Sequence, residues 1–130
     1  MKHIMVIDDS PTIRTSVDFA IRGLGYPLDH AENGADALEK VKEIKNKGDD
    51  VALCIVDINM PVMDGITFIN EFRRIDRFTP VLVLTTESEE QKIKAGKEAG
   101  ATGWIVKPFK NQDMVNIVHN VYHILVFKGF

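Results

Sequence analysis

The sequence predicts an α/β fold in which a parallel sheet is covered by helices on both faces. Five short runs of apolar, mostly β-branched residues alternate with five longer segments in which apolar residues recur at helical spacing. This alternation is typical of a parallel sheet, because a helix makes the crossover from each strand to the next. At 130 residues the chain has the length of one domain with a substantial core. We therefore expect a single domain over residues 1–130, without a second domain.

The first strand and helix are marked by their ends. His3–Asp8 (HIMVID) is an apolar run of strand length. Ser10 can cap the helix that follows, and Pro11 suits its first turn, because a proline there loses no hydrogen bond. Apolar residues then recur at helical spacing until Gly23 and Gly25 bring the helix to an end.

The next part of the chain supplies an edge strand, a second helix and the most apolar strand. Pro27–Glu32 is expected at an edge of the sheet because it contains charges and a proline. The second helix begins at Asn33 or Gly34 and carries lysines opposite its apolar face. Val51–Val56 is the third strand, and its Cys54 is expected to be a small buried residue of the core.

The rest of the chain repeats the alternation. The helix Glu89–Ala99, capped by Ser88, is polar and contains Gly96, which costs about 1 kcal/mol relative to alanine in a helix interior. We therefore expect this helix to be the least stable. The remaining elements are the helix Asp64–Asp76, the strands Pro80–Thr85 and Gly103–Lys107, and the last helix Asn111–Phe127.

Composition excludes several classes of protein. The net charge is −3, with 16 basic and 19 acidic residues, so bulk charge gives no case for a nucleic-acid partner. A single cysteine rules out an internal disulfide framework. No apolar run approaches the ~20 residues of a membrane span, and the N-terminal run is too short for a signal peptide. We expect a cytoplasmic protein that binds neither nucleic acid nor membrane.

Polar residues stand at the ends of four predicted strands. They are Asp8 and Asp9, Asp57, Thr85 and Lys107. In parallel α/β sheets, ligands bind beyond the carboxyl ends of the strands. Three carboxylates in one crevice should raise a pKa or recruit a cation, and ligands that are all oxygens favour Mg²⁺. Each residue alone has a structural explanation, but together they suit a phosphoryl group, with Asp57 as the nucleophile.

Four segments carry a resemblance to a known family. With VIDDSPTIR, VDINMPVMDG, VLVLTTES and GWIVKPF, residues 3–126 resemble a response regulator receiver domain, most closely the stand-alone chemotaxis regulators of the CheY type. The resemblance implies a flavodoxin-like (CheY-like) (βα)5 three-layer sandwich with a five-stranded parallel sheet in the order 2-1-3-4-5. It also implies a cis bond between Lys107 and Pro108.

The resemblance assigns roles at the predicted site. It makes Asp57 the phosphoacceptor. Mg²⁺ would be ligated by Asp9, by Asp57 and by the backbone carbonyl of Asn59, while Asp8 would act mainly through a bound water. The chain lacks none of the family's essential positions.

The resemblance also implies a switch. Thr85 would hydrogen-bond to the phosphoryl group and Lys107 would form an ion pair with it. As Thr85 moves inward, Trp104 would turn from outside to inside and remodel the face formed by residues 89–127. Asn59 and Glu87 would flank the path of the hydrolytic water. They match a fast-cycling pattern, which predicts a phosphoryl lifetime of seconds to a few minutes.

The favoured function is a phosphorylation-dependent switch of a two-component system, not a conventional enzyme. It would take phosphate from a sensor histidine kinase of the chemotaxis type and act on the flagellar motor switch or another motility target, such as twitching, with a phosphatase as a further candidate partner. Lys94 and Lys97 make the fourth helix unusually basic, which leaves the target open. Alternatives are a phosphorelay intermediate or phosphate sink, and a flavodoxin-type electron carrier, whose flavin phosphate Asp8 and Asp9 would repel.

The last helix has a wide apolar arc. A buried C-terminal helix explains this arc, and a partner or dimer surface is the alternative; we expect a monomer, with a weak dimer as the other option. His119 and His123 have the spacing of a metal pair but no third ligand, so no metal is expected there. The apolar residues expected to face the core are Met114, Val118, Val121 and Leu125, with Ile117, Ile124 and Val126 on the flanks.

Overall fold

The computed structural model describes the backbone of residues 1–86 and 90–128, and side chains among these as far as Val121. The strands are β1 (Lys2–Ile7), β2 (Leu28–Ala31), β3 (Asp50–Asp57), β4 (Val81–Thr85) and β5 (Gly103–Val106), and the helices are α1 (Pro11–Ile21), the short 3₁₀ helix η1 (Arg22–Leu24), α2 (Gly34–Asn46), α3 (Gly65–Ile75), α4 (Glu90–Ala99) and α5 (Asn111–Lys128).

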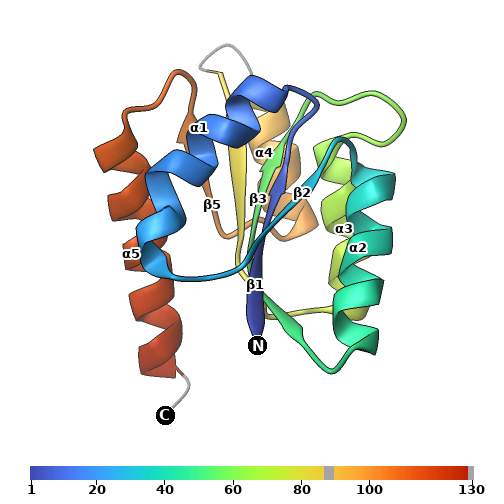
Figure 1. Ribbon diagram of the computed structural model, residues 1–130. Coiled ribbons are helices and arrows are strands. Elements are labelled where there is room, and N and C mark those ends of the chain that lie inside the picture. Colours follow the sequence, from blue (N-terminus) through green and yellow to red (C-terminus); the bar gives the residue numbers. More distant parts are fainter. Residues whose placement is uncertain (87–89, 129–130) are drawn as a thin grey trace.

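The strands form one parallel sheet in the order β2-β1-β3-β4-β5. Helices α1 and α5 cover one face and α2, α3 and α4 cover the other, which gives three layers (Figure 1). The predicted (βα)5 fold and the strand order implied by the resemblance are both confirmed. The predicted edge strand, β2, lies at an edge of the sheet.

Side-chain caps fix where three of the helices begin. The side-chain oxygens of Ser10, Asn33 and Asp64 each accept a hydrogen bond from the backbone N–H three residues further on, at 3.3, 2.9 and 2.8 Å. Each cap satisfies a donor that the first turn of a helix leaves unpaired. The predicted helix starts are therefore confirmed, with Asn33 and Asp64 as caps rather than first helical residues. The predicted cap Ser88 lies outside the described residues.

The core has two parts because both faces of the sheet are covered. Alternate residues of a strand point to opposite faces, so Met5 and Ile7 of β1 pack on the side of α2 and α3. Ile4 and Val6 of the same strand pack on the side of α1 and α5. A strand buried on both faces reads as a continuous apolar run, as predicted here. Cys54 is fully buried among these residues, and burial raises the pKa of its thiol.

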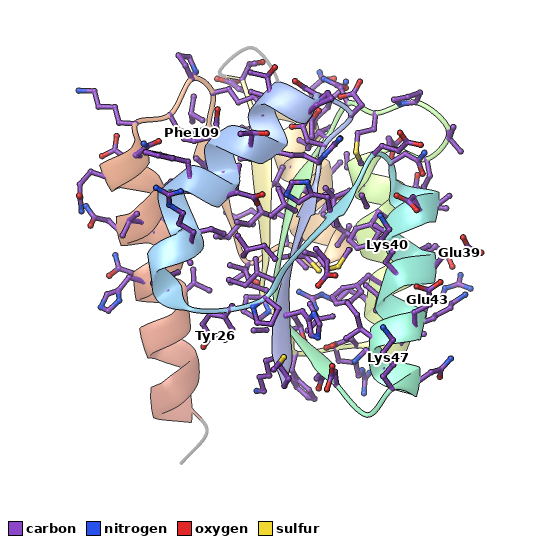
Figure 2. The ribbon with its side chains drawn as sticks, in the orientation of Figure 1. Tyr26, Glu39, Lys40, Glu43, Lys47 and Phe109 are labelled. Atoms are coloured by element: carbon purple, nitrogen blue, oxygen red, sulfur yellow. The ribbon has the colours of Figure 1, made fainter. Side chains whose placement is uncertain are left out.

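Helix α5 packs against the sheet through its predicted apolar face. Met114 and Val118 are buried, and Ile117 and Val121 are partly buried against the same cluster. The phenyl ring of Phe109, just before the helix, joins this cluster at the upper left of the sheet (Figure 2). The remaining predicted side chains, His123, Ile124, Leu125 and Val126, lie outside the described set. Among the described residues, no helix combines the length and apolarity that a membrane crossing requires.

A histidine near the N-terminal edge of the sheet should make stability depend on pH. The Nδ1 atom of His3 lies 2.5 Å from a carboxylate oxygen of Asp29, and its Nε2 atom lies 3.0 Å from one of Asp49. The hydrogen bond with Asp49, together with Asp29, raises the pKa of His3 above its usual 6.5 despite partial burial. A raised histidine pKa stabilises the fold below the unfolded value, and this stability is lost as the pH rises through the folded value.

We therefore expect His3→Gln to lower the free energy of unfolding more at about pH 5.5 than at about pH 8.5. These two pH values lie on either side of the usual range of histidine pKa values. The loss should be small, as for other surface ion pairs. Urea unfolding of both proteins across this range measures it. An equal loss at both pH values would show that protonated His3 does not contribute.

Candidate functional site

The strand registers bring the predicted site residues together. Where β1 pairs with β3, Ile7 lies opposite Val56, so the next residues, Asp8 and Asp57, come level. The last residue of β4 pairs with the last residue of β5, so Lys107 leaves the sheet beside the end of β4. These ends lie at the top of Figure 1, opposite the N-terminus. The sheet thus gathers residues from distant parts of the chain at one edge, as parallel α/β sheets do at their ligand sites.

Three carboxylates form the centre of this edge. Asp8, Asp9 and Asp57 each offer an oxygen, and the three oxygens lie within 4.8 Å of one another. Asp8 and Asp57 are buried, with 1% and 6% of their surface exposed, whereas Asp9 is exposed. The backbone N–H of Ser10 donates to Asp8 at 2.9 Å, and that of Asn59 donates to Asp57.

Lys107 joins the two buried carboxylates. Its ammonium nitrogen lies 3.1 Å from an oxygen of Asp57 and 3.3 Å from an oxygen of Asp8. Burial raises the pKa of both carboxyls, although Lys107 acts in the opposite direction. Burial also opposes the charged form of Lys107, but the two carboxylates outweigh it and raise the pKa of the ammonium. One cation thus only partly offsets the crowded negative charge.

The donor set fits a divalent cation. It consists of carboxylate oxygens, and burial makes their charge costly without a positive partner. Hard cations such as Mg²⁺ and Ca²⁺ prefer oxygen ligands of this kind. The cluster of Asp8, Asp9 and Asp57 could therefore hold a metal ion.

Comparison with known proteins identifies the family. The model of the response regulator receiver domain matches residues 4–119. The chain belongs to this family. The Mycobacterium tuberculosis transcriptional regulatory protein PrrA is 37% identical over 113 residues, which are 87% of this chain but 46% of PrrA. The Halobacterium salinarum chemotaxis protein CheY is 32% identical over 120 residues, which are 92% of this chain and 96% of CheY.

A solved structure agrees with this assignment. Vibrio cholerae chemotaxis response regulator CheY4 aligns with a TM-score of 0.82 and 36% identity, over 93% of this chain and 98% of CheY4. The chain thus spans nearly the whole of the chemotaxis relatives but less than half of PrrA. Receiver domains are phosphoacceptor switches that interact with histidine kinases, so the predicted two-component membership is confirmed.

Of the two residues predicted to move in the switch, Thr85 is buried and Trp104 lies outward. Thr85 is buried, and its hydroxyl donates to the carbonyl of Thr86 at 3.2 Å. Trp104 is 41% exposed, and the ammonium of Lys97 lies 5.4 Å from the centre of its ring. The predicted cis bond between Lys107 and Pro108 is present. Glu87, the second residue predicted to tune the lifetime, lies outside the described residues.

Two residues that contact the site were not predicted from the sequence. Arg14 of α1 donates to the backbone carbonyl of Asp8, and Lys92 of α4 donates to the side-chain oxygen of Asn59. Arg14 stands within the segment VIDDSPTIR, but nothing in that segment assigns it a partner. Lys92 is one of several lysines in its part of the chain, and no pattern distinguishes it from Lys94.

The loop after β3 contains a strained residue. Val62 has φ of +68°, and the N–H of Met63 donates to the carbonyl of Pro61 at 2.8 Å, which closes a tight turn around Val62. A β-branched side chain is a genuine outlier in this left-handed region. Val62 is also 85% exposed, so its side chain is not compensated by burial. The strain lies in the loop that connects Asp57 to α3.

Replacing Val62 by asparagine is expected to stabilise the protein. Positive φ costs most L-residues about 1–2 kcal/mol, and asparagine tolerates it better than a β-branched residue does. Because the valine is exposed, little burial is lost, and we expect a gain of about 1 kcal/mol in the free energy of urea unfolding. Val62→Thr is the control, since threonine is polar but still β-branched. Equal gains in both variants would mean that polarity, not backbone strain, is responsible.

Proposed function

We propose that this receiver domain accepts a phosphoryl group from a histidine kinase on Asp57 and presents a changed surface of α4, β5 and α5 to a target protein. The observation that carries the proposal is the buried Asp57 carboxylate, held by Lys107 beside Asp8 and Asp9 at the carboxyl edge of the sheet. A phosphoryl group at this point would meet both the positive charge and the oxygen cluster that phosphoryl transfer requires.

The chemistry follows from these groups. A carboxylate oxygen of Asp57 attacks the phosphorus of a phosphohistidine, the P–N bond breaks, and the departing imidazole takes a proton. An acyl phosphate then stands on Asp57. Lys107, 3.1 Å from that carboxylate, forms an ion pair with the phosphoryl oxygens. Mg²⁺ held by Asp9, Asp57 and the carbonyl of Asn59, with Asp8 acting through a water, would neutralise negative charge on the phosphoryl oxygens.

The proposed switch starts from the hydrogen bond of the Thr85 hydroxyl to the Thr86 carbonyl and from the exposed position of Trp104. A phosphoryl group on Asp57 offers the Thr85 hydroxyl a charged acceptor in place of the Thr86 carbonyl, and charge-assisted hydrogen bonds are the stronger kind. Movement of Thr85 leaves space behind it for Trp104 to turn inward. Phosphorylation would then shift a two-state equilibrium of the α4–β5–α5 face.

The proposed output is chemotaxis or another form of motility. The support is the match to CheY and CheY4 over nearly their whole length, which favours a chemotaxis kinase and a flagellar motor switch protein as partners. Regulation of transcription is a second candidate output, because the chain matches 46% of the transcriptional regulatory protein PrrA. We further propose that residues 1–130 act as one cytoplasmic, monomeric domain with a phosphatase as an additional partner.

Incubation with acetyl phosphate, with Mg²⁺ or with EDTA, tests the acceptor. We expect one phosphoryl group by intact-protein mass with Mg²⁺ and none with EDTA, and a change in Trp104 fluorescence on phosphorylation. The group should then be lost within seconds to minutes; a half-life of hours would contradict the proposed roles of Asn59 and Glu87. Binding of the phosphorylated protein to a motor switch protein, compared with phosphate return to a kinase, separates a motility output from a phosphate sink.

A further inference from the structure

A hydrogen bond joins α4 to the loop beside the phosphoacceptor. The ammonium of Lys92, the third residue of α4, donates to the side-chain oxygen of Asn59, two residues after Asp57. Both side chains are exposed, so the lysine reaches over the surface next to the carboxylate cluster. The contact connects the helix of the proposed output face to the edge where phosphoryl chemistry is proposed.

The chemistry of the two groups fixes the orientation of the Asn59 amide. An ammonium can only donate hydrogen bonds, so the amide must turn its oxygen, not its nitrogen, toward Lys92. That oxygen is the atom of the Asn59 side chain that can accept a hydrogen bond from a water. A carbonyl already engaged by a cation is a poorer acceptor for a second donor, because its electron density is drawn toward the cation.

Phosphoryl loss is the step that this orientation affects. The oxygen of a water attacks the phosphorus, the bond between phosphorus and the Asp57 oxygen breaks, and inorganic phosphate and the free carboxylate result. One proton of the water stays on the new phosphate and the other passes to solvent, so the water must be oriented with its oxygen toward phosphorus. An acceptor that orients the water speeds the reaction, and the side-chain carbonyl of Asn59, two residues after Asp57, is the group proposed for this role.

We propose that Lys92 is a positioning residue for phosphoryl loss. By holding the side-chain carbonyl of Asn59, it keeps this acceptor from the attacking water and lengthens the lifetime of phosphorylated Asp57. This inference rests on the proposed function of the same site.

Helix α4 is placed so that the contact can be maintained. At the far end of α4, the guanidinium of Arg73 donates two hydrogen bonds to the carbonyl of Gly100, at 3.1 and 2.9 Å. Arg73 also donates to the carbonyl of Thr79 at 2.7 Å, so it anchors this end of the helix to α3 and to the start of β4. The Lys92 contact holds the opposite end, next to the site.

Lys94 provides a matched control on the same helix. It is exposed, and at 3.6 residues per turn its side chain lies about 200° around the helix from that of Lys92. Lys94→Met and Lys92→Met remove the same charge and keep a similar aliphatic stem. Lys92→Arg keeps a charged donor, so it should restore the contact if the donor is what matters.

The experiment phosphorylates each variant with acetyl phosphate and Mg²⁺, removes the donor and follows phosphoryl loss by intact-protein mass. We expect Lys92→Met to shorten the half-life by about 2–5-fold, the effect of losing one exposed charged hydrogen bond. Lys92→Arg and Lys94→Met should remain close to wild type. In an Asn59→Ala background, Lys92→Met should have no further effect on the half-life, because the side-chain carbonyl that Lys92 holds is already absent.

Four results would overturn the inference. Equal shortening in Lys92→Met and Lys94→Met would indicate a general effect of charge, and a full effect of Lys92→Met in the Asn59→Ala background would show that Lys92 does not act through Asn59. If wild type and all variants fail to gain a phosphoryl group, the proposed function is wrong and this inference is wrong with it. If phosphorylation is normal and all half-lives agree, only the inference is wrong.

Discussion

Asp57→Asn is expected to abolish phosphoryl acceptance from acetyl phosphate or a kinase. The amide lacks the charged oxygen that attacks phosphorus, and loss of a nucleophile costs on the order of 10⁴–10⁶ in rate. The fold should persist, because asparagine has the same shape and can still accept the hydrogen bond from the N–H of Asn59. Intact-protein mass after incubation with Mg²⁺ and the phosphodonor measures the effect.

The same substitution should make the metal-free protein more stable. Burial raises the pKa of Asp57, which means that the folded state holds the charged carboxylate at a cost when the pH is above that pKa. The neutral amide removes this cost, and Lys107 keeps Asp8 as a partner at 3.3 Å. In EDTA at about pH 7, we expect Asp57→Asn to have a higher free energy of unfolding than the wild-type protein. Added Mg²⁺ should stabilise the variant less than it stabilises the wild type.

Asp9→Asn is the matched control for Asp57→Asn. It removes one charge from the same cluster but leaves the nucleophile in place, and Asp9 is exposed rather than buried. We expect it to raise the Mg²⁺ concentration needed for phosphorylation without abolishing the reaction. A phosphoryl group on Asp57→Asn under the same conditions would place the acceptor elsewhere in the chain.

Much of the fold follows from the sequence because both faces of the sheet are buried. Val51–Val56 has no polar interruption, so its length and its end at Asp57 are visible without the structure. The site could be predicted for a related reason: a carboxylate that ends an apolar run is costly unless it has a partner. The detailed roles of Asn59 and Trp104 came only from the resemblance to the family.

The contacts that were missed depend on three-dimensional distances that no local pattern encodes. Lys92 and Asn59 are 33 residues apart in the chain, and their contact depends on how α4 lies over the loop after β3. Val62 was missed for the opposite reason, because valine is among the residues least expected at positive φ. In both cases the tertiary structure imposes a geometry that the local sequence does not favour or reveal.

Gly65→Ala is expected to damage both the fold and the site. A Cβ atom at Gly65 would lie 2.2 Å from the carbonyl oxygen of Asp57 and 3.0 Å from the Cα atom of Ile58. These are backbone atoms of β3 and of the residue after it, so no side-chain rotation can relieve the clash. The N–H of Gly65 also donates to the carbonyl of Ile58 at 2.9 Å, which holds the two segments at this close distance.

We expect Gly65→Ala to lower the free energy of unfolding by about 3 kcal/mol, the upper part of the range for overpacking. Gly96→Ala is the control, because its Cβ would meet only a side-chain atom of Val83 at 3.8 Å. Alanine there should stabilise α4 by up to about 1 kcal/mol. Urea unfolding of the two variants should therefore give changes of opposite sign.

The clash should also reduce phosphorylation beyond its effect on stability. To accept a Cβ atom, the start of α3 must move away from the end of β3, and this movement displaces the backbone of Asp57. A misplacement of about 1 Å at a reacting group can cost on the order of 10² in rate. We expect slow phosphorylation of Gly65→Ala even at low temperature, where the protein is mostly folded. A folded Gly65→Ala protein with wild-type kinetics would show that the close approach of α3 to β3 serves packing alone, and that Asp57 is positioned by the sheet and Lys107.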